Sequence, residues 1–261
     1  MSLARLARPL AAATALLAAP PVLALSPNLL VPSALPYNVY RGGSLLGEGL
    51  ISLKPAGTPD CWFFSQEASP KSWLKLLSGD VLEQSNFCVQ DGKIRPVAYR
   101  YSRDGVGSGK ENFSLRFDWP KQQAIYQNGD VRPITEGTLD RLSIQLALRD
   151  WLLSERSATG KEPVGEHEVK FADRKKVDSY RFEVRAHERV TVPAGTFDTT
   201  RLDRTDSKTR RTQFWLSPEH GYIVIKAEQQ RDDDPVVKLM LNKLPPELLP
   251  AAAASALPKP D

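Results

Sequence analysis

Residues 180–227 read YRFEVRAHERVTVPAGTFDTTRLDRTDSKTRRTQFWLSPEHGYIVIKA. In its first part apolar side chains alternate with polar ones, and only Glu188 interrupts the row formed by Tyr180, Phe182, Val184, Ala186, Val190 and Val192. Alternation over so many residues predicts a half-buried β-strand. A turn at 193–195 and further strands over 197–202, 211–216 and 222–227 then predict a long antiparallel meander. We expect the rest of the chain to pack against it.

The remaining segments also favour β-structure. Two strands are predicted within 37–53, on either side of Gly42-Gly43, and a hairpin within 83–101 around Asp91-Gly92. Gly47 and Gly49 fall on the apolar face, which indicates a bend or the close approach of another backbone. The other predicted strands cover 61–65, 111–119, 124–126, 169–171 and 236–241.

Two helices are expected. The longer one has Thr138 as its N-cap, Asp140 and Arg141 in its first turn, and an apolar stripe that includes Leu146 and Trp151. Because this helix is apolar over much of its circumference, we expect it to lie across the concave face or the mouth of a curved sheet. Ser69-Pro70 predicts the start of a short helix that ends at Ser78.

The ends of the chain differ in composition from its middle. Residues 1–24 have the basic start, short apolar core and small-residue cleavage site of a signal peptide, with cleavage after Ala24, although an uncleaved anchor is the alternative. We expect an extended lead-in over 25–36, one barrel-like domain over 37–244 and a disordered, Pro/Ala-rich tail over 245–261. Arg5 and Arg8 carry two of the +4 formal charges, so the mature chain is only weakly basic, which does not favour nucleic-acid binding.

Two cysteines, Cys61 and Cys88, occur in apolar strand segments. An even number of cysteines in an exported chain favours a disulfide, and two separate buried thiols are the alternative. A redox-active pair is not favoured, because the residues lack C-x-x-C spacing.

Several segments resemble reactive or binding motifs without fulfilling them. Residues 105–110 lack the glycine, the Ser/Thr and the following helix of a phosphate-binding loop. His167, His187 and His220 have no partner at metal-ligand spacing, and the acidic run 232–234 lacks the spaced oxygens of a calcium loop. Asp118 and Asp140 do not form a recognisable acid–base pair. Lys208, Arg210 and Arg211 fit a solvated hairpin tip, with a basic patch for lipid head groups or phosphates as the alternative. We therefore expect no catalytic residue, metal or cofactor.

Six short motifs occur in a fixed order along the chain. They are Y-x-V-Y at 37–40, P-x-x-Y-x-Y at 96–101, F-D-W at 117–119, L-D-x-L-S at 139–143, P-A-G-T-F at 193–197 and F-W-L-S-P at 214–218. In these motifs and their order the chain resembles the Gram-negative envelope family known as domain of unknown function 3108. The resemblance implies a periplasmic protein with a strongly curved antiparallel sheet, similar in shape to lipocalins and to carriers of outer-membrane lipoproteins. It implies no established activity.

Two kinds of function are compatible with this fold. A curved, aromatic-lined sheet can bind a hydrophobic or lipid-like envelope ligand, such as an acyl chain, and the candidate lining residues are Phe113, Phe117, Trp119, Leu146, Trp151, Phe182 and Trp215. The alternative is a structural or assembly factor of the cell envelope, with a core filled by its own helix and a protein-binding outer edge. An enzyme, a nucleic-acid partner and a membrane-spanning segment in the mature chain are not expected. An apolar cavity favours the first function, and a filled interior favours the second.

Overall fold

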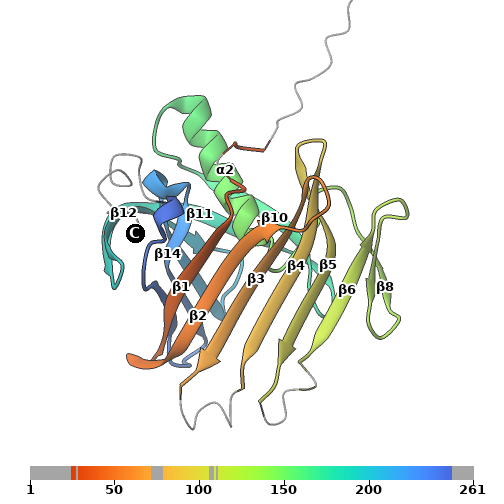
Figure 1. Cartoon of the computed structure of the whole chain (residues 1–261), viewed down its shortest axis with the longest axis horizontal. Helices are drawn as coiled ribbons and strands as arrows, with labels where there is room; N and C mark the ends of the chain where they lie inside the picture. The colour runs from red at the N-terminus through yellow and green to blue at the C-terminus, as the bar shows by residue number, and fades with distance from the viewer. Residues whose placement is uncertain (1–24, 28, 72–78, 106–108, 110, 249–261) are drawn as a thin grey trace, which may run out of the picture.

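The computed structural model describes residues 25–27, 29–71, 79–105, 109 and 111–248. Within these ranges, fifteen strands form one sheet in the order β8-β7-β6-β5-β4-β3-β2-β1-β15-β14-β13-β12-β11-β10-β9 (Figure 1). All neighbouring strands are antiparallel except β9 and β10. The first and last strands of the chain, β1 and β15, pair in the middle of this sheet, with Tyr37 opposite Leu241.

The elements have the following bounds. The first eight strands are β1 (Ser33–Arg41), β2 (Ser44–Pro55), β3 (Cys61–Pro70), β4 (Val81–Gln90), β5 (Lys93–Arg103), β6 (Phe113–Asp118), β7 (Gln123–Tyr126) and β8 (Val131–Pro133). After β9 (Leu139–Asp140) and helix α2 (Ile144–Thr159) come β10 (Glu166–Ala172), β11 (Val177–Val192), β12 (Gly195–Arg204), β13 (Arg210–Ser217), β14 (Ile223–Arg231) and β15 (Val237–Leu241). The described residues also form the short 3-10 helices η2 (Pro218–His220) and η3 (Pro246–Leu248).

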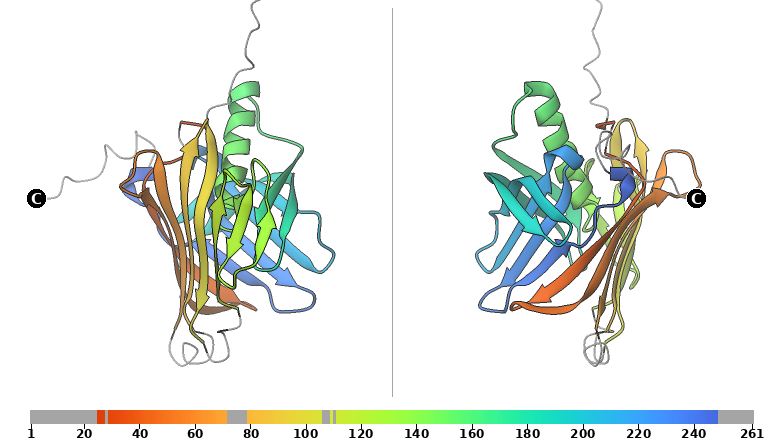
Figure 2. Two further views of the ribbon diagram at one scale, coloured as in Figure 1. Left: turned by 90° about the vertical axis from the view of Figure 1, so that its right-hand side faces the viewer. Right: turned by 60° about the vertical axis from the view of Figure 1, so that its left-hand side comes forward.

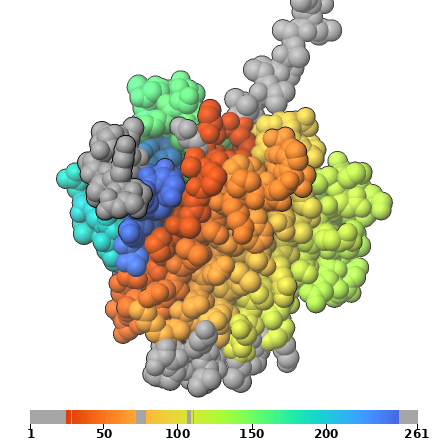
Figure 3. All heavy atoms as spheres, viewed as in Figure 1, coloured from red at the N-terminus to blue at the C-terminus, as the bar shows by residue number. Residues whose placement is uncertain are grey.

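The sheet is strongly curved and remains open. Its register shifts between Val39 and Tyr40, Asn86 and Phe87, Val184 and Ala186, and Trp215 and Leu216. Such irregularities bend a strand and increase its twist. Figure 2 shows the consequence: the two halves of the sheet fold toward each other, with α2 between them. Figure 3 shows the outer face over β1–β6 as an unbroken surface. The expected curved antiparallel meander is confirmed.

Helix α2 supplies much of the core on the concave side. Its residues Ile144, Leu146, Leu148 and Leu152 are buried. Gly160 adopts the left-handed conformation after the last turn and donates its N–H to the Arg156 carbonyl, a common way to end a helix. The Trp151 ring stacks on His167 of β10, with 5.1 Å between the ring centroids. The helix is thus held against the second half of the sheet.

The expected helix starts are wrong. Leu139 and Asp140 pair with Phe171 and Ala172 as strand β9, and α2 begins only after Ser143, not after Thr138. Strand pairing takes precedence here because this segment forms the end of the sheet. Likewise, Ser69 and Pro70 pair with Glu48 and Gly47 at the end of β3 and do not start a helix. The rest of that expected helix, 72–78, lies outside the described residues.

The lead-in and the tail also differ in detail from the expectation. Strand β1 begins at Ser33, inside the expected lead-in, and Leu29 before it is fully buried. The Ser26 N–H donates to an Asp150 carboxylate oxygen of α2 at 2.9 Å. The lead-in is therefore anchored to the helix. At the other end, η3 occupies 246–248, and the remaining tail lies outside the described residues.

Gly47 marks a close approach between backbones, as its position on the apolar face predicts. A Cβ atom added there would lie 2.1 Å from the Ser69 carbonyl oxygen of β3, a distance that no real side chain tolerates. Any larger residue would push β2 and β3 apart, so glycine is required at this position.

The expected disulfide between Cys61 and Cys88 is confirmed. The two residues lie directly opposite each other on β3 and β4, with 3.9 Å between their Cα atoms. Phe87 and Trp62 lie beside them on the opposite face of the sheet and form the next cross-strand pair. The bridge therefore fastens two adjacent strands on the outer face and leaves the concave face to apolar side chains.

Candidate functional site

A cavity of about 240 Å³ lies on the concave side, between the start of α2 and the strands β11–β15. Phe214 of β13 lies opposite Ala227 of β14, which in turn lies opposite Leu239 of β15. This row lines the cavity together with Phe182, whose ring centroid is 5.8 Å from that of Phe214. Side chains from several strands therefore provide an apolar wall that can hold hydrocarbon.

A partly buried ion pair forms part of the opposite wall. Arg141 Nη2 is paired with Glu83 Oε1, and the Tyr99 hydroxyl donates to Glu83 Oε2 at 2.8 Å. The Arg141 guanidinium also lies over the Tyr101 ring, 5.0 Å from its centroid. Burial and the neighbouring Glu83 charge raise the pKa of Tyr99 well above its usual range, so this phenol stays a hydrogen-bond donor. Burial alone would lower the pKa of Arg141, but the Glu83 carboxylate outweighs it and the net pKa is raised.

Replacing Glu83 with alanine is expected to lower the free energy of unfolding by about 2–3 kcal/mol. The change leaves Tyr99 and Arg141 without their shared acceptor, and the cost falls below that of a fully buried pair because a third of the Arg141 side chain is exposed. Urea unfolding followed by circular dichroism measures this loss. The matched control is Glu136→Ala, which removes an ion pair to Arg95 at 46% exposure and should cost less than about 1 kcal/mol. Equal losses in the two variants would contradict the prediction.

Asp140 is fully buried beside this ion pair. Its Oδ1 accepts the N–H groups of Leu142 and Ser143 at 2.9 and 2.8 Å, and its Oδ2 accepts the hydroxyls of Ser85 and Ser143 at 2.5 and 2.9 Å. Burial raises the pKa of the carboxyl from 3.8 to about 6, and the hydrogen bonds only partly oppose this. Its bonds with Leu142 and Ser143 hold the β9–α2 connection together, and its bond with Ser85 ties that connection to β4, which is a structural role.

The Asp140 carboxyl should make stability depend on pH. Because its folded-state pKa is raised, its contribution is fully present below pH 3.8 and is lost as the pH rises through about 6. We expect the free energy of unfolding, relative to Asp140→Asn, to be about 2 kcal/mol higher at pH 4.5 than at pH 7.5. Burial lowers the pKa values of His167 and His220, which has the opposite effect on stability, but both histidines remain in the variant and cancel. A pH-independent difference in urea unfolding would refute the prediction.

Arginines also line the cavity at the ends of strands β12 and β13. Arg204, opposite Phe182, pairs with Asp206 at 2.6 Å and lies 3.4 Å from the centroid of the Tyr180 ring. Arg210 belongs to the run expected at a hairpin tip, and the structure places it in the cavity wall. The neighbouring Thr212 hydroxyl is buried without a hydrogen-bond partner among the described residues. This end of the cavity is therefore polar and basic.

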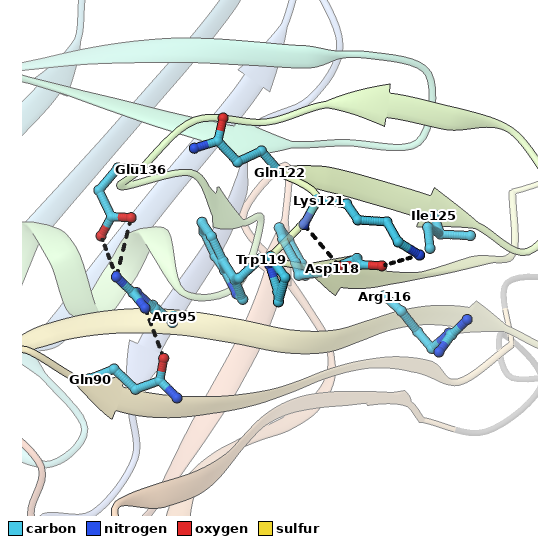
Figure 4. Close-up of a pocket in the computed structure, with 11 residues that line it drawn as sticks. Gln90, Arg95, Arg116, Asp118, Trp119, Lys121, Gln122, Ile125 and Glu136 are labelled. Carbon is cyan, nitrogen blue, oxygen red and sulfur yellow. Dashed lines mark hydrogen bonds and ion pairs between the residues drawn. The ribbon is translucent and has the colours of Figure 1, made fainter.

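A second hollow, of about 840 Å³, lies at the other end of the sheet, beside β5–β8 (Figure 4). Arg95 donates to Gln90 at 2.9 Å and to Glu136 at 3.2 Å, and its guanidinium lies 5.8 Å from the Trp119 ring centroid. Lys121 pairs with Asp118 at 3.3 Å. Arg95, Glu136, Lys121 and Asp118 thus compensate one another. This open groove is therefore a weaker candidate for a ligand site than the apolar cavity.

The structure separates the seven candidate lining residues. Phe182 lines the 240 Å³ cavity, whereas Phe117 and Trp119 line the groove beside β5–β8 and stack on each other at 5.8 Å. Phe113 packs against Tyr99 and Tyr101. Leu146 is buried in the core, and Trp151 packs on His167.

Trp215 lies on the face of the sheet opposite to Phe214. Its indole N–H donates to Glu188 at 2.7 Å, and Lys226 lies 4.0 Å from its ring centroid. Arg201 pairs with the same Glu188 oxygen at 3.1 Å. Glu188, which breaks the apolar row of β11, is thus the centre of a polar cluster on the outer face. The shift of register at Arg185 reverses the faces of β11 at this point.

Sequence reasoning missed Glu83, Arg141 and Arg204 as cavity residues. The available signal was a charged side chain on the inward face of a predicted strand, as at Glu83 between Val81 and Ser85.

The remaining candidate motifs supply no site. Within the described ranges, no group of His, Cys, Asp and Glu side chains is arranged to hold a metal. Residues 106–108 and 110 of the glycine-rich loop lie outside the description. No described helix combines the length and the apolar character needed to cross a bilayer.

Together these features define the class: a mainly β protein in which an open, curved antiparallel sheet and helix α2 enclose an apolar cavity with charged ends. A family model described as "Protein of unknown function (DUF3108)" matches residues 36–242, and the chain belongs to this family. The resemblance carried by the six sequence motifs is thereby confirmed.

Three solved structures of low sequence identity are similar to the chain over most of its length. One is a β-barrel-like protein of domain of unknown function DUF1849 from Brucella abortus, 12% identical, with a TM-score of 0.44 over 82% of this chain and 97% of that one. A candidate exported protein with a YmcC-like fold from Bacteroides fragilis is 12% identical, with a TM-score of 0.31 over 80% and 93%. A candidate lipoprotein from Parabacteroides distasonis is 15% identical, with a TM-score of 0.32 over 82% and 95%. No curated protein matches the chain.

Proposed function

We propose that the protein is an exported, non-enzymatic component of the cell envelope that binds a hydrophobic, lipid-like ligand in its concave cavity. The observation that carries the proposal is the apolar wall formed by Phe182, Phe214, Ala227 and Leu239 around about 240 Å³ of space. Export is supported by the signal-like residues 1–24 and by a disulfide, which persists in oxidising compartments.

The size of the cavity favours a narrow ligand. Pockets for drug-sized molecules typically enclose about 300–1,000 Å³, and this cavity is slightly smaller. A single hydrocarbon chain fits such a space better than a lipid with several chains. Polar residues lie at both ends of the cavity, Gln145 at one and Arg210 at the other, and either end can receive the polar group of the ligand.

Mass spectrometry tests the proposal directly. Protein purified from the periplasm should begin at Leu25 and should carry a co-purified lipid or fatty acid under native conditions. Ala227→Trp should abolish the bound species, because the indole fills the cavity between Phe214 and Leu239. The matched control is Leu50→Trp at a residue that is 36% exposed, which should keep the ligand. Folded protein without any bound or bindable lipid would overturn the proposal.

An envelope assembly factor is the second candidate. The observation that favours it is the groove beside β5–β8, where strand β8 forms the edge of the sheet and Val131 is 51% exposed. An edge strand can pair with a strand of a partner. If Ala227→Trp removes the lipid without affecting the envelope phenotype of a deletion strain, whereas Val131→Pro abolishes complementation, this second function is favoured.

A further inference from the structure

Arg149 of α2 is a cation without a counter-ion. Its Nε donates to the Gly221 carbonyl oxygen at 3.0 Å, and no carboxylate among the described residues pairs with its guanidinium. The other arginines around α2 are all compensated: Arg141 pairs with Glu83, and Arg156 pairs with Glu162 at 3.0 Å. Arg149 is therefore the exception within this part of the molecule.

The surroundings of Arg149 make this exception costly. The side chain is half-buried, and desolvation by the surrounding protein lowers its pKa to about 10. The hydroxyl of the neighbouring Tyr37 donates to the Val224 carbonyl at 2.6 Å and is neutral, so it cannot balance the charge of the guanidinium. A charge that is partly removed from water and lacks a partner is unfavourable, and this favours a partner supplied from outside the chain.

The space beside Arg149 adjoins the ligand cavity. Arg149 lines a void of about 20 Å³ together with Tyr37 and Gln145, which is room for about one water molecule. Ile51, Gln145 and Val224 line both this void and the 240 Å³ cavity. A single acid oxygen placed in this water-sized void would thus belong to a ligand whose remaining atoms lie in the adjoining cavity.

We propose that Arg149 binds the anionic head group of the ligand, and that the ligand is a single-chain amphiphile ending in a carboxylate or a phosphate monoester. This inference rests on the proposed function and specifies the ligand class for the same site. The guanidinium would donate its Nη hydrogens to the acid oxygens, while Nε keeps its bond to Gly221. The chain would extend along Phe182 and Phe214 toward the end of the cavity that holds Arg204 and Arg210.

Arg204 and Arg210 are weaker candidates for the head group. Asp206 already neutralises Arg204 at 2.6 Å. Arg210 begins strand β13, at the end of the sheet nearest the loop 205–209, where water can solvate its charge. Neither position combines enclosure with the absence of a counter-ion, as Arg149 does.

Binding of three twelve-carbon probes to the full mature protein tests the inference: dodecanoic acid, dodecyl phosphate and dodecanol. The wild-type protein should bind at least one of the acids about tenfold or more tightly than the alcohol, because a charged hydrogen bond distinguishes them. The acid that binds more tightly shows whether the head group is a carboxylate or a phosphate monoester. Arg149→Gln should reduce this preference to less than about threefold while the affinity for dodecanol stays unchanged. Arg149→Lys should keep part of the preference.

Three controls make the result interpretable. Arg156→Gln, on the same helix but paired with Glu162, should retain the full preference for the acid. Circular dichroism checks that each variant folds, and Arg149→Met replaces Arg149→Gln if the latter does not. A preference that survives in Arg149→Gln but is lost in Arg210→Gln would overturn the assignment. Equal wild-type binding of acid and alcohol overturns only this inference, whereas failure of all three probes overturns the proposed function itself.

Discussion

Replacing both Cys61 and Cys88 with serine is expected to lower the free energy of unfolding by about 3–4 kcal/mol. The bridge closes a loop with a sequence separation of 27 and thereby restricts the unfolded chain. The native sheet should change little, because the β3–β4 ladder pairs the residues from Ala68 to Cys61 with those from Val81 to Cys88 in one continuous register. The effect should therefore appear in the unfolding midpoint and not in the folded spectrum.

Urea unfolding of the oxidised protein, the reduced protein and the double variant measures this effect. Reduction of the wild-type protein should lower the midpoint to that of Cys61→Ser/Cys88→Ser, and the reductant should leave the double variant unchanged. Thiol labelling of the non-reduced protein in denaturant should modify neither cysteine. Identical midpoints with and without the bridge would contradict the prediction.

Leu146→Ala is expected to cost about 2–5 kcal/mol. Leu146 is completely buried between α2 and the sheet, so the truncation loses buried apolar area and leaves a void that a rigid β-sheet cannot fill. The change in unfolding free energy is again measured with urea. Leu45→Ala, at a residue 43% exposed, is the matched control and should change stability by less than about 0.5 kcal/mol. An unchanged melting temperature in Leu146→Ala would mean that the helix does not pack as described.

Period-two alternation was a sufficient guide to most of the sheet. Phe113, Leu115 and Phe117 are all buried on one face of β6, as their spacing predicts. The turn signals at Asp91-Gly92 and 193–195 also place the hairpins correctly. These features depend on local chemistry, which the sequence displays directly.

Features that depend on distant pairing could not be predicted in the same way. The N-terminal limit of α2 follows from the pairing of Leu139 and Asp140 with β10, about thirty residues later in the chain. The outward position of Glu188, which accepts the Trp215 indole N–H, follows the face reversal at Arg185, because a shift of one residue moves every later side chain of β11 to the other face. Arg149 gave no signal at all, since a lone arginine in a helix is ordinary until its surroundings are known.

Strand β1 can find its second neighbour only after the last strand of the chain is available. Its partner β15 ends at Leu241, about two hundred residues after Tyr37, whereas β2–β8 and β10–β14 form from strands that follow one another directly. Each half of the sheet can thus assemble as a local meander, and the seam between β1 and β15 must close last. Until then a long strand edge remains unpaired at the centre of the future sheet. The late closure exposes the folding chain to association with other chains, so its folding should depend on chaperones more than its finished structure suggests.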